Sequence, residues 1–157
     1  GIKLDEEKGT ASYDVTFVAV NVDDNGVITA CAFDSLGADV PMDAVADPSG
    51  EVKTKHELGY DYGMVAYNAS DKEWFEQANA LAAYAVGKTV EELKNGAVGE
   101  TGYAQDTDLA TSATIYLGGY VSAIEAAVSI GAAASIGAAG PVQAERPADG
   151  KDLGMAA

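Results

Sequence analysis

The sequence predicts an α+β domain in which an antiparallel β-sheet, built on an N-terminal hairpin, packs against about three α-helices. A β-branched stretch over residues 13–22 is followed by Asp-Asn-Gly and a second apolar stretch over 27–33, which is typical of a hairpin. Farther along, apolar residues recur at helical spacing after two Ser/Thr-x-x-Glu sequences, which is typical of capped helices. The two patterns follow one another along the chain, as in an α+β fold.

The hairpin turn, Asp23–Gly26, also contains the Asp and Asn oxygens used by calcium loops, but the twelve-position spacing and the terminal Glu of such a loop are missing. Cys31, in the second strand, is the only cysteine. A single cysteine cannot form an internal disulfide, and one Cys with one His is too few for a zinc site. We therefore expect no metal, and a buried, unreactive thiol at Cys31.

Composition limits the class of partner. The 157 residues carry 25 acids and nine bases, a formal net charge of −16. Nucleic-acid binding rests on clustered Lys and Arg, so this charge argues against it. The sequence has no apolar span of about 20 residues, so it does not predict a transmembrane helix. We expect contact with a membrane only through a lipid anchor that was removed along with a signal sequence.

Three regions follow from the patterning. Residues 1–9 are short and charged and are predicted to be a leader, residues 10–130 a single domain, and residues 131–157 an Ala/Gly/Pro-rich C-terminal extension. Residues 34–50 are predicted to be mostly loop, with a short strand near 38–42 as an alternative.

The predicted helices start at recognisable caps. Ser70 to Glu73 reads as a capping box before a helix that ends near Val86, with Trp74 as a core anchor. A second capping box at Thr89 predicts a short helix to about residue 96. Apolar residues at helical spacing predict a last helix over 115–130.

One loop concentrates unusual side chains. Lys53 and Lys55 form, with His56, the only basic cluster, and Tyr62 and Met64 follow within a glycine-punctuated stretch. Such a loop can offer charge to a phosphate and flat rings to a heterocycle. Equally, the lysines can be a solvated surface and the tyrosines lids on the core.

A second stretch, Asp108–Ile115, places an acid, three hydroxyls and small residues before the last predicted helix. Unpaired N–H groups and the helix dipole favour an anion at a helix N-terminus. The same residues also suit an ordinary helix cap.

These residues resemble the FMN-binding domain family, found in periplasmic subunits of sodium-pumping quinone reductases and in surface lipoproteins of anaerobic Gram-positive bacteria. The hallmark, Asp-x-x-Ser/Thr-Gly-Ala-Ser/Thr, is matched at Asp108, Thr111, Ala113 and Thr114. Ser112 stands where the family has Gly. Tyr116 stands where a further hydroxyl residue is usual.

The resemblance implies a fold and a cofactor, FMN, whose phosphate a flavin transferase esterifies to the later hydroxyl, here Thr114. It equally allows tight binding by the hydroxyls of Thr111, Ser112 and Thr114, with Asp108 organising the turn. Membrane redox proteins would then be partners.

A second resemblance covers residues 12–130 and is to secreted clostridial lipoproteins whose activity is not established. It rests on Lys53 to Gly59, on Tyr62-Gly63-Met64, on Glu73-Trp74 with Gln77, and on Gly87-Lys88-Thr89. It implies a location outside the cytoplasmic membrane, at the cell surface.

Three functions stay open. The first is an extracytoplasmic FMN-binding, electron-transfer domain of a surface lipoprotein. The second is a non-flavin small-ligand-binding domain, and the third a structural domain of a secreted lipoprotein. A redox carrier or binding protein is favoured over a turnover enzyme, because no nucleophile pattern accompanies the single His.

Overall fold

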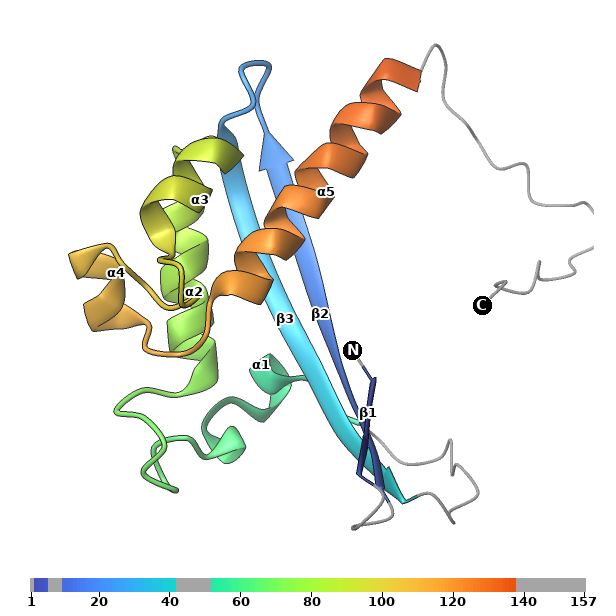
Figure 1. Cartoon of the computed structure of the whole chain (residues 1–157), viewed down its shortest axis with the longest axis vertical. Helices are drawn as coiled ribbons and strands as arrows, with labels where there is room; N and C mark the ends of the chain where they lie inside the picture. The colour runs from blue at the N-terminus through green and yellow to red at the C-terminus, as the bar shows by residue number, and fades with distance from the viewer. Residues whose placement is uncertain (1, 6–9, 42–51, 138–157) are drawn as a thin grey trace, which may run out of the picture.

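A computed structural model of the chain describes residues 2–5, 10–41 and 52–137 (Figure 1). It confirms the predicted α+β class. The three strands, β1 (Ile2–Asp5), β2 (Thr10–Val22) and β3 (Ile28–Pro41), form one antiparallel sheet in the order β1-β2-β3. The predicted leader thus contributes a short edge strand, over its residues 2–5.

The hairpin between β2 and β3 follows from its turn. The side-chain Oδ1 of Asp23 accepts hydrogen bonds of 2.9 Å from the N–H groups of both Asn25 and Val27. Gly26 has a φ of 77°, which only glycine adopts at little cost. Hydrogen bonding to Val27 lowers the pKa of Asp23, so its carboxylate stays ionised and keeps the turn closed.

The second strand is longer than predicted. Residues 34–41, expected to be mostly loop, continue β3 in register with β2, for example through Val15 opposite Leu36. Gly37 and the acidic residues suggested a loop, but pairing along the whole length of β2 overrides their low strand propensity. Residues 42–50 of that predicted loop lie outside the described residues.

The helices follow the sheet. They are α1 (Lys55–Leu58), the 3₁₀ turn η1 (Gly59–Tyr62), α2 (Trp74–Ala85), α3 (Val90–Ala97), α4 (Thr107–Ser112) and α5 (Gly118–Gly137). The capping box at Thr89 is confirmed, since its hydroxyl accepts from Glu92 N. The box predicted at Ser70 is wrong: Glu73 is the N-cap of α2, and its N–H donates to Glu76 Oε2 at 2.8 Å.

The last helix extends past its predicted end at residue 130 and covers the start of the predicted C-terminal extension. Residues 138–157 of that extension lie outside the described residues. None of the helices in the described part of the chain combines the length and apolarity that crossing a membrane requires.

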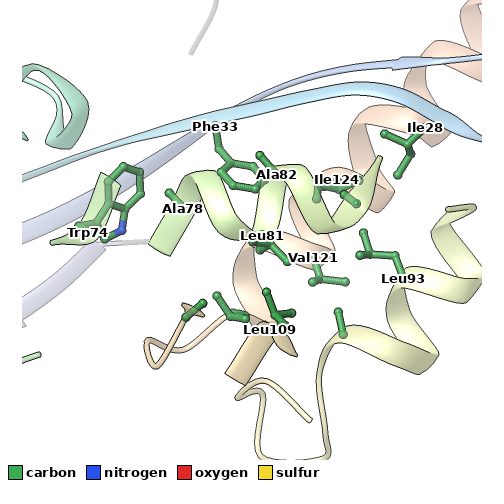
Figure 2. Packing of buried hydrophobic residues seen from close by; sticks show 14 residues of the cluster. Ile28, Phe33, Trp74, Ala78, Leu81, Ala82, Leu93, Leu109, Val121 and Ile124 are labelled. Carbon is green, nitrogen blue, oxygen red and sulfur yellow. The ribbon is translucent and has the colours of Figure 1, made fainter. Parts of the chain in front are cut away.

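The core lies between the sheet and the helices, with α2 against β3 and α5 against β2 (Figure 1). Figure 2 shows Phe33 pointing from β3 toward Ala82 of α2, and Leu81 among Val121 and Ile124 of α5. Leu81 and Ile124 are fully buried. Trp74 lies at one end of this cluster and is 2% exposed, so the prediction that it anchors the core is confirmed. That end borders the candidate site.

Candidate functional site

A buried carboxylate shapes the loop that precedes α2. Glu73 is 1% exposed, and its two oxygens accept hydrogen bonds from Met64 N at 2.9 Å and Val65 N at 3.0 Å. A carboxylate buried in this way is stabilised by such N–H donors. The interaction fixes Met64 and Val65 at the N-terminal end of α2.

Gln77, one turn farther along α2, is fully buried and ties this loop to the Asp108–Ile115 stretch. Its Oε1 accepts three hydrogen bonds: from Thr114 N at 2.7 Å, from Thr114 Oγ1 at 3.1 Å and from Ile115 N at 3.1 Å. Its Nε2 donates to Ser70 Oγ at 3.1 Å and to Lys72 O at 3.0 Å. One amide therefore holds together two segments that are far apart in the sequence.

The network also orients the hydroxyl of Thr114. Ser70 Oγ already accepts from Gln77 and, at 3.3 Å, from Lys72 N. Its own proton is thus free to be donated to Thr114 Oγ1, 3.3 Å away, while Thr114 donates to Gln77. The exposed Thr114 oxygen keeps one lone pair for the adjoining cavity.

That cavity, which we term the polar cavity, has a volume of about 390 Å³. Lys72 is its cation, and its Nζ donates to Thr111 O at 2.7 Å. A lysine among hydroxyls suits an anion such as a phosphate. The polar cavity is lined by residues of the 65–72 loop and of the Thr114 stretch: Val65, Asn68, Ser70, Asp71, Lys72, Thr111 and Thr114.

A second cavity, the aromatic cavity, has a volume of about 550 Å³. Lys55 Nζ lies 5.1 Å from the ring centroid of Tyr62 and 5.5 Å from that of Trp74. Trp74 Nε1 donates to Tyr120 OH at 3.0 Å, which fixes both rings. Aromatic, apolar and a few polar residues line it: Thr16, Lys55, Tyr62, Met64, Ala69, Trp74, Ile115, Tyr116, Gly119 and Tyr120.

The two cavities are neighbours. In each of three segments, adjacent residues line one cavity and then the other. Met64 lines the aromatic cavity and Val65 the polar one. The same alternation occurs at Ala69 and Ser70 and at Ile115 and Thr114. Thr114 therefore stands at the boundary between an aromatic space and a hydroxyl-lined space that contains one lysine, Lys72, and one acid, Asp71.

The predicted site residues are divided among three places. Thr111 and Thr114 line the polar cavity, and Lys55, Tyr62 and Met64 line the aromatic cavity. Lys53 lines a third cavity of about 270 Å³, which Lys55 and Tyr62 share.

The other three predicted residues line none of these cavities. Ala113 is 1% exposed in the core. Ser112 ends α4 and is partly buried, and Asp108 is exposed, where its carbonyl accepts from Thr111 Oγ1 at 2.8 Å.

The helix-terminus geometry expected for the Thr114 stretch is not the one observed. Residues 107–112 themselves form α4, capped by Asp106, and α5 starts only at Gly118. The N–H groups of Thr114 and Ile115 already donate to Gln77. Lys72 therefore supplies the positive charge near Thr114, because α5 does not begin at this residue.

Sequence reasoning missed Lys72, Ser70 and Gln77. The sequence pattern places Ser70 and Lys72 only in a helix cap. The available signal was composition: Lys72 is one of nine bases in a strongly acidic chain. The second resemblance includes Gln77 but gives it no role, and its helical spacing matches an ordinary core-facing position.

Behind the aromatic cavity, His56 supports Trp74. The two rings meet edge to face, with centroids 5.2 Å apart. His56 Nδ1 lies 3.4 Å from Asp34 Oδ1, and its backbone N–H donates to the same oxygen. Partial burial raises the pKa of Asp34, but hydrogen bonds from Thr54, Ser35 and His56 outweigh it, so this pKa lies below its ordinary value.

Part of the chain is similar to a known protein. The chain is 34% identical to the chlorophenol reductase of Desulfitobacterium hafniense in a match that covers 57% of this chain and 32% of that protein. The chain thus spans about a third of the length of this relative. No known family model matches the chain, and no solved structure matches it. Within the described residues, no group of three His, Cys, Asp or Glu side chains is placed to hold a metal ion.

Proposed function

We propose that this chain is an extracytoplasmic FMN-binding, electron-transfer domain of a surface lipoprotein. The observation that carries the proposal is the position of Thr114 between the polar cavity and the aromatic cavity. FMN has two parts that match the two cavities: an anionic phosphate for the polar cavity and a flat ring system for the aromatic cavity. Both cavities lie within the range of about 300–1,000 Å³ that is usual for small-molecule sites.

The residues present fit the cofactor. Lys72 would hold the phosphate beside Thr114, and Trp74 with Tyr62 would contact the ring system. When bound, the flavin supplies the electron-transfer chemistry. The chain orients it, and Lys55 is the positive charge nearest the aromatic walls.

Covalent attachment at Thr114 is compatible with the network. An ester replaces only the hydroxyl proton of Thr114. Gln77 Oε1 then still accepts from Thr114 N and Ile115 N, and Ser70 can still donate to the ester oxygen. Thr114 is also exposed, as the substrate of a flavin transferase must be. The name of the relative, a reductase, is consistent with a redox role.

The test uses protein produced in cells that contain the flavin transferase. We expect a yellow protein whose intact mass carries one FMN moiety, and we expect Thr114→Ala to lose the addition. Thr114→Ser should retain it. Thr29→Ala, at an exposed strand position away from the three cavities, is the matched control and should be flavinylated normally.

Two further outcomes separate the alternatives. An unmodified protein that nevertheless binds added FMN with saturation would show tight, noncovalent binding. An unmodified protein that binds neither FMN nor riboflavin would rule out the proposal.

A second candidate is a binding domain for a small aromatic ligand other than flavin. One observation favours it. The N–H groups of Thr114 and Ile115 already donate to Gln77, so neither is available to a phosphate. Saturable binding of a planar aromatic acid, competed by neither FMN nor inorganic phosphate, would identify this function.

A further inference from the structure

Tyr116 is a large aromatic residue that is both exposed and tightly held. Its side chain is 55% exposed and lines the aromatic cavity. Its ring meets that of Tyr103 edge to face, with centroids 5.8 Å apart and planes at 89°. An exposed tyrosine normally samples several rotamers, so the packing behind this one calls for a physical reason.

Two glycines make the room for this ring. A Cβ on Gly102 would lie 2.7 Å from Tyr116 Cζ, and a Cβ on Gly118 would lie 2.8 Å from Tyr116 OH. Real Cβ atoms essentially never approach so closely, so any other residue at either position would displace the ring. Gly102 also has a φ of 78°, a conformation that favours glycine.

The backbone on both sides of the ring is fixed as well. Leu117 N and Gly118 N donate to Gly102 O at 2.8 and 3.0 Å. The turn that carries Gly102 is closed by Gly99 N donating to Tyr103 O at 3.0 Å. Tyr116 therefore packs against the backbone at Gly102 and Gly118 and against Tyr103, and it also lines the aromatic cavity.

We infer that Tyr116 is a preorganised wall of the aromatic cavity that selects planar, fused-ring ligands. The inference rests on the proposed function and deepens it by naming a specificity-determining residue. A ring that is already fixed loses little rotamer entropy when a ligand packs on it. Tyr116 thus adds an aromatic surface to the cavity wall beside Ile115 and Tyr120.

The prediction separates the two parts of the ligand. Tyr116→Ala should weaken binding of FMN and of riboflavin by the same factor, roughly tenfold, which is typical of losing one aromatic contact. Tyr116→Phe keeps the ring and should bind both almost as well as the wild type. Inhibition of FMN binding by inorganic phosphate should give the same inhibition constant in all three proteins, because the polar cavity is unchanged.

Tyr60→Ala is the matched control. Tyr60 is 72% exposed and meets Phe75 edge to face at 5.2 Å, yet it is not among the residues that line the aromatic cavity. Its replacement should leave both affinities unchanged. Gly118→Ala tests the packing of the ring: it keeps Tyr116 but should weaken riboflavin binding, because the added methyl group displaces the ring.

The measurements are equilibrium titrations monitored by flavin fluorescence, with the melting temperature of each variant recorded beside them. Wild-type affinity in a folded Tyr116→Ala protein would overturn this inference and leave the proposed function standing. A wild-type protein that stays unmodified in cells with the flavin transferase and binds neither flavin would overturn both.

Discussion

The buried amide of Gln77 accepts hydrogen bonds from both the backbone N–H and the hydroxyl of Thr114, at 2.7 and 3.1 Å. Thr114, the candidate attachment residue, is therefore held by a residue of α2 that lies 37 positions earlier in the chain. Because Gln77 is fully buried, its hydrogen bonds form away from solvent and their loss is costly.

Replacing Gln77 should show this cost. Gln77→Leu leaves the Thr114 and Ile115 N–H groups without their acceptor, and we expect a loss of about 3 kcal/mol in the free energy of unfolding. Gln77→Glu keeps the acceptor for these N–H groups but buries a charge and turns an oxygen toward Lys72 O, so it should destabilise the fold as well. Urea denaturation measures both. Equal stability of wild type and Gln77→Leu would show that water replaces the amide.

Lys72 should contribute to binding of the phosphate and not of the ring. We expect Lys72→Gln to weaken FMN binding about tenfold, the size of one charge-assisted hydrogen bond, and to leave riboflavin binding unchanged. Salt should weaken binding of FMN more than binding of riboflavin in the wild type, because only FMN carries the phosphate. This difference should be smaller in Lys72→Gln. Lys94→Gln is the control, because Lys94 pairs with Glu125 on the surface at 2.7 Å. Equal losses for both flavins would show that Lys72 shapes the loop instead.

Cys31 should make stability depend on pH in the alkaline range. Burial raises the pKa of its thiol from 9.0 to about 11. A pKa raised on folding gives a stabilisation that is complete below pH 9 and is lost as the pH rises toward 11. The unfolding free energy of the wild type should therefore fall between these values more steeply than that of Cys31→Ala. Parallel curves for the two proteins would contradict the assignment.

The core should depend strongly on Leu81. This side chain is fully buried between α2 and α5 (Figure 2), and Leu81→Ala is expected to cost about 2–5 kcal/mol through lost burial and an unfilled cavity. Val86→Ala, at a position 45% exposed, should cost less than about 1 kcal/mol. Thermal or urea unfolding compares them. A cost at Leu81 no larger than that at Val86 would place the centre of the core elsewhere.

Local chemistry explains which parts of the fold could be predicted. The turn at Gly26 and the cap at Thr89 depend on residues within four positions of each other, and both are observed. The continuation of β3 to Pro41 depends on pairing with residues 10–17 of β2, which lie 17 to 31 positions earlier, whereas local composition predicts a loop. Ser70 has the residue type of a cap, yet the neighbouring Glu73 takes that role because its carboxylate also binds the loop.

The candidate site shows the same limit. Lys55, Tyr62 and Met64 were predicted from one local stretch, and the structure places them around one cavity. Their proximity to Ile115 depends on the path of α2, which the sequence does not disclose. Whether the cavities hold flavin stays a prediction that the experiments above address.

The hydrogen bond between the hydroxyls of Ser70 and Thr114 joins residues that are 44 positions apart in the sequence. In an unfolded chain Thr114 is chemically like any other threonine, because the serine, amide and lysine around it have not yet been gathered. Contacts of such long sequence separation form after local helices and turns. Any modification that needs this surrounding must therefore follow folding, and the modified fraction of a preparation would report how much of the chain had reached its native state.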